Sequence, residues 1–212
     1  MSKARNAKVF LCGEGSNELG SRFGDAAYQS DERPGVLHAL LVRVQPTGWE
    51  IGGVREWKRI RKYRRGGPQH KDTHNVLGAA LDAKEAGCDV LAFSRDCDRD
   101  AHRRDAIEEG IRMVPSTLPS APAVIGGVAI PTLEGWILAL LQELRTEEFT
   151  PRRAEQKLEQ KGVKLKVTEA MVRVVEEADL SKVPSDATSL AAWIARARNV
   201  LPPLVEKLAK EN

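Results

Sequence analysis

Short apolar runs alternate with stretches of helical periodicity between residues 7 and 150, and this alternation restricts the fold more than any other feature of the sequence. The clearest apolar runs are AKVFLCG (7–13) and CDVLAFS (88–94), each short enough for a single buried strand. Strands that alternate with helices are typical of a mostly parallel sheet covered by helices on both faces. We therefore predict an α/β fold.

The same alternation assigns the other segments up to residue 144. VLHALLVRV (36–44) follows a Pro-Gly break and is predicted as a strand, and APAVIGGVAIP (121–131) as a strand or a strand pair. The basic run VREWKRIRKYRR (54–65) is predicted as a short helix or helical arm. Further helices are expected at 73–87, 100–113 and 132–144.

The character of the chain changes after Pro151. From there on, the sequence indicates helices with no strand between them, so we place a boundary near Thr150. A length of 212 residues suits one α/β domain with a small addition. We expect residues 1–150 to form the α/β domain and residues 151–212 a helical C-terminal appendage.

Composition limits the cellular setting and the class of partner. The 33 Lys and Arg residues against 30 Asp and Glu residues give a net charge of only +3, so attraction to nucleic acid must come from local clusters. The three cysteines form no CxxC pair, which favours a reduced, cytoplasmic protein. No run reaches membrane-spanning length and the N-terminus resembles no signal peptide, so no membrane association is expected.

Acidic residues follow two of the expected strands at the points where the chain leaves the core. Glu14 comes directly after the first strand, and Asp96, Asp98 and Asp100 follow CDVLAFS on alternate positions. Ligands of open parallel sheets bind beyond the carboxyl ends of the strands. If strand geometry persists to Asp98, then Asp96 and Asp98 share a face and can meet Glu14. Converging carboxylates repel one another, and a hard cation such as Mg²⁺ or Mn²⁺ relieves that repulsion.

These motifs carry a family resemblance. CGEGSNE followed downstream by RDCDRD resembles the TOPRIM domain of topoisomerases, bacterial primases and OLD-type nucleases, in which a glutamate follows the first strand and an Asp-x-Asp pair follows a later one. The segment AIPTLEGWILALL is similar to a P-x-x-E-x-W motif of small, stand-alone bacterial TOPRIM proteins. The resemblance covers roughly residues 9–141.

The resemblance implies roles for individual residues. Glu14 matches the catalytic glutamate, Asp96 and Asp98 match the metal-binding pair, and Asp100 extends that pair. Glu134 matches an additional acid of OLD-like members that helps to bind a second ion. A late lysine that some OLD-type nucleases carry has no clear counterpart here.

By resemblance, the expected function is that of a nucleic-acid phosphodiesterase, an endonuclease dependent on Mg²⁺ or Mn²⁺, within a bacterial anti-phage or mobile-element defence system. An alternative from a different class is a non-catalytic subunit that keeps the fold and binds a partner ATPase or nucleic acid, with the helical tail as its interaction surface. A nucleotidyl-transfer unit like those of primases and topoisomerases is a third hypothesis.

Several of these residues also have a purely structural explanation. Aspartates favour helix N-termini, so the run from Asp96 to Asp100 can serve to cap the following helix. Glu18 is interpreted as a solvated helix residue in preference to a supporting acid of the site. His70 and His74 in HKDTH have zinc-like spacing, but the zincin glutamate is missing, which favours two unrelated histidines in a loop.

The basic run 54–65 is the best candidate for contact with a polyanion. We expect phosphate contacts from four of its cations, Arg59, Lys62, Arg64 and Arg65. Interleaved Trp57 and Tyr63 could stack on bases. The competing interpretation is a solvated basic face whose Trp57 and Ile60 belong to the core.

Overall fold

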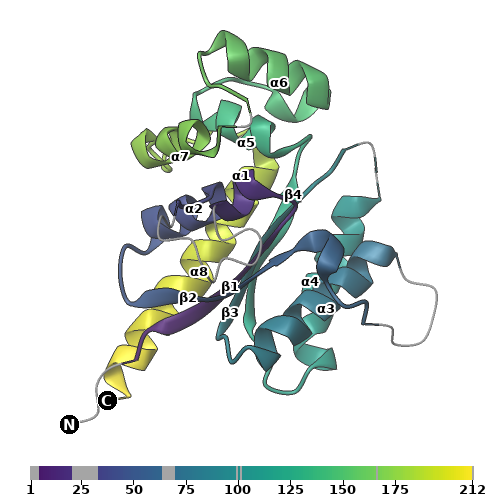
Figure 1. Cartoon of the computed structure of the whole chain (residues 1–212), viewed down its shortest axis with the longest axis vertical. Coiled ribbons are helices and arrows are strands. Elements are labelled where there is room, and N and C mark those ends of the chain that lie inside the picture. Colours follow the sequence, from purple (N-terminus) through teal and green to yellow (C-terminus); the bar gives the residue numbers. More distant parts are fainter. Residues whose placement is uncertain are drawn as a thin grey trace.

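The structure of the chain is a computed structural model that describes residues 5–20, 33–63, 70–98, 100, 102–165 and 167–211. Its centre is a sheet of four parallel strands in the order β2-β1-β3-β4 (Figure 1). The strands are β1 (Ala7–Gly13), β2 (Trp49–Glu56), β3 (Val90–Asp96) and β4 (Ala123–Ala129). The predicted α/β class with a parallel sheet is confirmed.

Both faces of the sheet are buried, because alternate residues of each strand point to opposite sides. In β1, Val9 and Leu11 belong to one hydrophobic cluster, whereas Phe10 and Cys12 belong to another. The second cluster is covered by α3 (Lys71–Glu85) and α4 (Arg103–Thr117). The first is covered by the remaining long helices, among them α2 (Val36–Val44), α5 (Leu133–Leu140) and α8 (Thr188–Lys210). Figure 1 shows these two helical layers on either side of the sheet.

The prediction of a strand at 36–44 is wrong, because this segment forms helix α2. A short run that is apolar throughout does not distinguish a strand from a buried helix. Its buried positions include Val36, Leu37, Leu40 and Leu41, which recur at the three-to-four-residue spacing of one helix face. Its leucines and alanine also favour helix.

The predicted helix at 54–65 is also wrong, because this segment begins inside β2 and continues as a single 3-10 turn, Trp57–Arg59. The signal for β2 is weak because Gly52 and Gly53 interrupt it. Gly53 has a packing reason, since a Cβ there would lie 2.7 Å from the Phe10 ring, next to a register shift in the β1–β2 pairing. Residues 64–69 lie outside the described residues.

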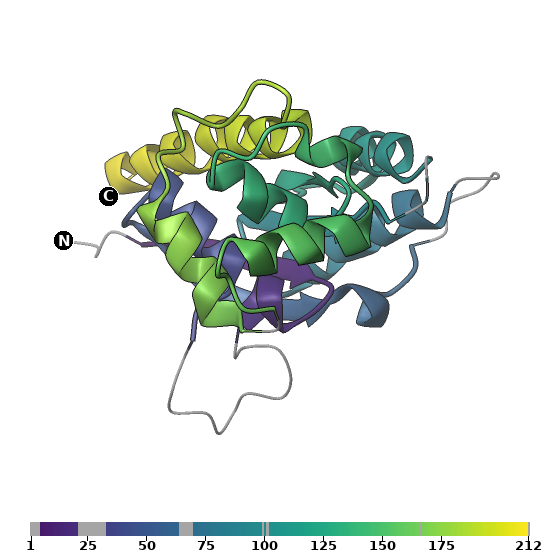
Figure 2. The same cartoon turned by 90° about the horizontal axis from the view of Figure 1, so that it is seen from above.

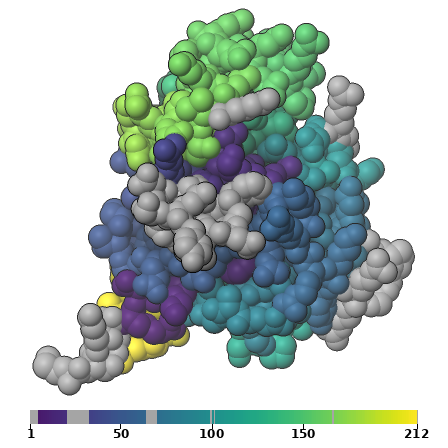
Figure 3. Space-filling view, viewed as in Figure 1, coloured from purple at the N-terminus to yellow at the C-terminus, as the bar shows by residue number. Residues whose placement is uncertain are grey.

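After residue 150 the chain forms α6 (Pro151–Gln160), α7 (Thr168–Glu177) and α8. Figures 1 and 2 show α6 and α7 grouped with α5 at one end of the molecule, and in the space-filling view they form a green lobe (Figure 3). Helix α8 instead lies along the sheet, where Trp193 is fully buried and its Nε1 donates to the carbonyl of Phe93 at 2.9 Å. The tail thus contributes to the same hydrophobic cluster as the sheet, and the boundary near residue 150 stays a prediction.

Within the described ranges, none of the helices combines the length and apolar character needed to span a membrane. The three cysteines, Cys12, Cys88 and Cys97, are free thiols.

Candidate functional site

Each of the four strands has an acidic residue at or shortly beyond its carboxyl end. Glu56 ends β2 and Asp96 ends β3, while Glu14 directly follows β1 and Glu134 lies in the first turn of α5, after β4. Because the four strands are parallel, these ends lie along one edge of the sheet. The edge is where an open α/β sheet binds its ligands.

Glu14 connects the ends of β1 and β3, which are neighbours in the sheet. Its Oε1 accepts a hydrogen bond from the backbone amide of Asp96 at 2.9 Å and forms an ion pair with Arg95. Burial lowers the pKa of the Arg95 guanidinium, and the nearby charge of Arg103 lowers it further. Glu14 is therefore fixed in place with its charge compensated.

Asp96 faces the side of the sheet covered by α5, because it alternates with Val90 and Ala92, which pack there. Its Oδ1 accepts a hydrogen bond from the amide of Leu133, the first residue of α5, at 2.8 Å. Burial raises the pKa of Asp96 to about 8, and the charges of Glu18, Glu134 and Asp98 add to the increase. A carboxyl group in this environment resists ionisation unless a cation joins it.

Glu18 lies on the short helix α1 (Ser16–Leu19) and is only 5% exposed, so its interpretation as a solvated helix residue is wrong. Burial raises the pKa of Glu18 to about 7, and repulsion from Glu134 contributes to the increase. Glu18 packs directly over Gly13, where an added Cβ would lie 2.6 Å from the Glu18 Cβ. The glycine that ends β1 was the signal in the sequence that this acid turns inward.

Glu18, Asp96 and Glu134 together form what we call the buried acid group, of which Glu18 is buried and Asp96 and Glu134 are partly exposed. None of them forms an ion pair with a basic side chain in the part of the chain that the structure describes. Next to Glu134 in sequence, Thr132 is buried and its hydroxyl has no hydrogen-bond partner among the described residues. Backbone amides donate to two of the three acids, Gly15 to Glu18 at 3.0 Å and Leu133 to Asp96 at 2.8 Å, and the carboxylates of the three do not all approach within 4.8 Å of one another.

Asp98 lies apart from this group. Strand β3 ends at Asp96, and Asp98 has a left-handed backbone with φ of 54°, so the strand geometry does not continue to it. The side chain is half exposed and its Oδ2 accepts a hydrogen bond from Nη1 of Arg103 at 2.8 Å. Arg103 also donates to the carbonyls of Asp96 and Cys97, so it holds together the whole turn that follows β3.

Asp100 joins a second cluster on the α3 and α4 side of the sheet. The ligand atoms of His70, Asp72 and Asp100 lie within 4.8 Å of one another, an arrangement that can hold a metal ion. His70 Nε2 is 3.5 Å from Asp100 Oδ2, and Arg103 Nε is 3.1 Å from the buried carboxylate of Asp72. Arg103 thus compensates this cluster, whereas the described residues provide no such cation for the buried acid group.

Sequence reasoning missed this second cluster. HKDTH suggested two unrelated histidines, and the two do separate, since His74 Nδ1 lies 2.8 Å from the carbonyl of Tyr63 while His70 turns toward Asp100. Asp72 lies in the first turn of α3 and Asp100 in the segment between β3 and α4, and only the tertiary fold brings them together. The spacing within HKDTH contained no signal for that contact.

The expected phosphate-binding segment is engaged in ion pairs at its start. Arg59 Nε lies 3.0 Å from Glu56 Oε2, and Lys58 Nζ lies 2.6 Å from Glu56 Oε1, although both cations are more than half exposed. Trp57 is buried with its ring centroid 5.3 Å from that of Phe93, so it is not available to stack on a base. Of the four predicted contacts, Arg59 and Lys62 are described, and Arg64 and Arg65 lie outside the described residues.

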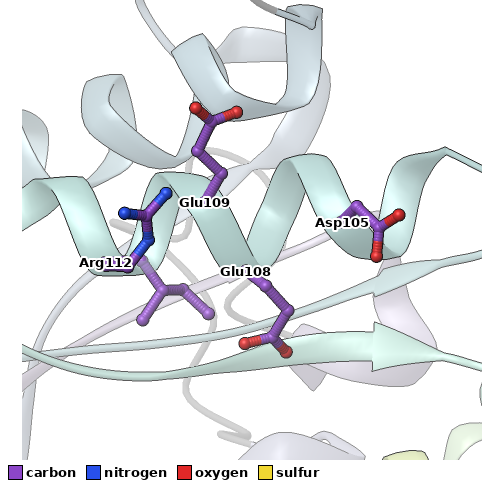
Figure 4. Close-up of a pocket in the computed structure, with 5 residues that line it drawn as sticks. Asp105, Glu108, Glu109 and Arg112 are labelled. Carbon is purple, nitrogen blue, oxygen red and sulfur yellow. The ribbon is translucent and has the colours of Figure 1, made fainter.

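A shallow surface depression lies elsewhere, along α4. Figure 4 shows four of its lining residues, Asp105, Glu108, Glu109 and Arg112, on that helix. Glu108 also forms an ion pair with Arg196 of α8. None of the acids at the carboxyl edge of the sheet lines it. We assign the depression no role.

No family model matches the sequence, and no curated protein or solved structure matches the chain. The structure shows the parallel sheet and the acidic residues at its edge, whereas the resemblance to the TOPRIM domain rests on the sequence motifs alone.

Proposed function

We propose that the chain is a TOPRIM-fold phosphodiesterase that cleaves nucleic acid, an endonuclease that uses Mg²⁺ or Mn²⁺. The observation that carries this proposal is the buried acid group, three carboxylates of distant sequence origin without a compensating cation among the described residues. In an open α/β sheet, ligands bind beyond the carboxyl ends of the strands, which is where these acids lie.

Different residues of the chain would have different roles in the proposed reaction. Glu18, Asp96 and Glu134 would hold the cation, which would offset charge on the phosphate and lower the pKa of water. Glu14, fixed by Arg95 and by the amide of Asp96, is positioned to accept a proton from the attacking water. Arg95 lies beside it and can balance the phosphate charge.

Asp98 and Asp100 remain proposed ligands under this hypothesis, in a different position from the other acids. Asp98 is half exposed at the mouth of the site, where exchange of Arg103 for a cation would free its carboxylate. Asp100 shares its cluster with His70 and Asp72, which gives a second place for an ion.

The substrate class follows from charge and from the resemblance. The exposed cations at the end of β2, Arg59 among them, lie on the same edge of the sheet as the acids and suit a phosphate backbone. We further propose, from the resemblance, a role in anti-phage defence with a partner ATPase, for which the lobe of α6 and α7 offers a helical surface.

A specific observation favours the alternative, a non-catalytic subunit that binds nucleic acid or a partner ATPase. Arg95 pairs with Glu14, and Arg103 pairs with Asp98 and also with Asp72 and Asp100, so part of the acidic edge is compensated without metal. A subunit of this kind would retain the fold without hydrolysing phosphodiesters.

Cleavage by a Glu134→Gln variant separates the two hypotheses. With Mn²⁺ and single- or double-stranded DNA or RNA, the wild-type chain, alone or with its partner, is expected to cut at least one of them. The variant should lose about 100-fold in rate, because a carboxylate that holds the cation is removed. Its melting temperature should stay within about 2 °C, since a change at a partly exposed position has a small effect on stability.

Glu155→Gln is the matched control, because Glu155 is an exposed acid on α6, away from the edge. It should cut like the wild type. Equal cleavage by the Glu134 and Glu155 variants would remove Glu134 from the site, and a wild type that cuts none of the substrates would favour the non-catalytic subunit.

A further inference from the structure

Asp82 on α3 is a buried acid that holds two exposed arginines of the segment before that helix. Its side chain is 1% exposed, and Arg61 Nε donates to its Oδ1 at 2.8 Å while Arg55 Nη1 lies 3.1 Å from its Oδ2. The side chains of Arg55 and Arg61 are themselves 40% and 55% exposed. A buried carboxylate needs a partner for its charge, but one cation is sufficient for that purpose.

Glu56 repeats this arrangement at the end of β2. Its side chain is 6% exposed, with Lys58 Nζ 2.6 Å from its Oε1 and Arg59 Nε 3.0 Å from its Oε2. Both of these cations are more than half exposed. Two buried acids therefore hold four exposed cations, twice the number that their own charge requires. We call these four the ordered cations, namely Arg55, Lys58, Arg59 and Arg61.

The backbone that carries the ordered cations is fixed against α3. Trp57 and Ile60 are buried in the hydrophobic cluster that α3 and α4 cover. Gly78 of α3 permits a close approach of the segment, because a Cβ there would lie 1.7 Å from the carbonyl oxygen of Arg61. The ordered cations thus project from a rigid support, so little further ordering is needed when a ligand binds them.

The surface that a ligand would meet at this segment is mainly positive. Asp82 and Glu56 are buried, whereas the ordered cations and the neighbouring Lys62 are exposed or partly exposed. Glu85, which pairs with Arg61, is the exposed exception. A guanidinium has five N–H donors, so an arginine that is bound to an acid keeps donors for a phosphate. Several cations along one short segment suit successive phosphates of a nucleic-acid backbone.

The aromatic residues of the same segment are not available to bases. Trp57 is buried against Phe93, and Tyr63 packs against the same hydrophobic cluster. Proteins that bind single strands stack the bases on aromatic side chains beside a basic groove. Cations without such a platform contact the phosphate backbone alone, which a double helix presents with its bases already stacked on one another.

We propose that the ordered cations bind the phosphate backbone of a nucleic-acid duplex without regard to its sequence, and that Asp82 and Glu56 are positioning residues for them. This inference rests on the proposed function for nucleic acid as the substrate, and it narrows that substrate to double strands. The competing explanation is a solvated basic face whose cations only balance the two acids.

The experiment measures the Kd of the full-length chain in EDTA for short labelled DNA and RNA duplexes and for their single strands, by fluorescence anisotropy at several salt concentrations. The wild type should bind at least one duplex more tightly than its single strands. The Arg55→Gln/Lys58→Gln variant leaves each buried acid one cation, so it should fold. It should lower the steepness of log K against log salt by about 2 and raise the Kd at least about 10-fold. If it does not fold, Arg59→Gln/Arg61→Gln is judged by the same quantities.

The matched control removes the same charge elsewhere. Lys207→Gln/Lys210→Gln changes two exposed lysines in the last turns of α8, and it should bind the duplex like the wild type. Equal losses in the control and in Arg55→Gln/Lys58→Gln would show that net charge alone drives binding, and would overturn the inference.

Asp82→Asn tests the positioning role by the direction of its effect. The change makes the chain more positive, so a solvated basic face predicts tighter binding of the duplex. If Asp82 positions Arg55 and Arg61, the Kd should instead rise, by about 3-fold, because the two side chains must be ordered when the duplex binds. Tighter binding would overturn the positioning role.

The outcomes also distinguish this inference from the proposed function. Duplex binding that depends on the ordered cations, in a chain that cuts nothing with Mn²⁺, supports the inference and overturns the nuclease. Cleavage with Mn²⁺ by a chain whose Kd is unchanged in Arg55→Gln/Lys58→Gln overturns the inference alone. Single strands bound as tightly as duplexes overturn the assignment to double strands. Binding to vesicles of phosphatidylserine but to neither duplex would assign the cations to a membrane surface and overturn the inference.

Discussion

In metal-free solution at about pH 8.5, the Asp96→Asn variant is expected to melt at a higher temperature than the wild-type chain. Asp96 is partly buried beside Glu18 and Glu134, and this burial together with the neighbouring charges raises its pKa to about 8. Above that pH the wild type must keep an ionised carboxylate in unfavourable surroundings. Asparagine has no charge, and its side-chain oxygen can still accept the hydrogen bond from Leu133.

The pH window follows from the two pKa values of Asp96. Because the folded value of about 8 exceeds the unfolded value of roughly 3.9, the stability linked to its protonation is fully present below the unfolded pKa. That stability is lost progressively as the pH rises from about 4 through about 8. The advantage of the asparagine variant should therefore be small near pH 4 and grow to the order of a few kcal/mol at about pH 8.5.

Addition of Mn²⁺ should reverse the order of the two melting temperatures, so that the wild type melts above the Asp96→Asn variant. A cation that binds the ionised carboxylates stabilises the wild type by mass action, whereas the variant lacks one of the ligands. Asp105→Asn, a change at an exposed acid on α4, is the control and should match the wild type in both conditions. A wild type that melts above the Asp96 variant in EDTA at about pH 8.5 would show that Asp96 is already compensated and needs no cation.

The Trp193→Ala variant should lose about 3–5 kcal/mol of unfolding free energy, as large aromatic truncations in a core do. Trp193 is fully buried on α8, with its ring centroid 6.1 Å from that of Trp136. Its indole nitrogen donates to the carbonyl of Phe93 in β3, so the truncation removes a hydrogen bond along with packing. Urea unfolding followed by fluorescence or circular dichroism measures the loss.

Leu204→Ala on the same helix is the matched control, because Leu204 is only partly buried. The Leu204→Ala variant should lose much less unfolding free energy than Trp193→Ala, since the change uncovers less apolar surface. If Trp193→Ala changed the stability by under about 1 kcal/mol, the contact of α8 with the sheet would contribute little to the fold. Such a result would favour the prediction that residues 151–212 are a separate helical appendage.

Local pattern was sufficient to predict much of the fold and part of the site. The strands around Val9, Leu91 and Ile125 are apolar runs bounded by turn residues, and each was predicted near its observed place. Glu14 and Asp96 were expected to converge because parallel neighbours end at one edge; the structure joins them through the backbone amide of Asp96, which donates to Glu14 at 2.9 Å, and the predicted metal site of their carboxylates stays a prediction.

The rest depended on contacts that no local pattern contains. The segments 36–44 and 54–65 were assigned the wrong elements, because the former is apolar throughout and the latter begins beyond the two glycines that hide β2. Glu18 packs against Gly13, where a Cβ would lie 2.6 Å from the Glu18 Cβ, and the sequence prediction did not use that glycine. Arg103 reaches Asp72, Asp98 and Asp100 from the first turn of α4, so its role follows from the placement of two helices and a turn.

The proton balance of Mn²⁺ binding tests the central claim most directly. At about pH 7, Asp96 with a pKa of about 8 is mostly protonated and Glu18 with a pKa of about 7 is half protonated. A cation can bind them only as carboxylates, so titration calorimetry in two buffers of different ionisation enthalpy should reveal the release of at least about one proton per ion. The release should fall toward zero at about pH 9.5, where both groups are already ionised. Binding without proton release at pH 7, or no binding at all, would contradict a cation site built from buried carboxyl groups.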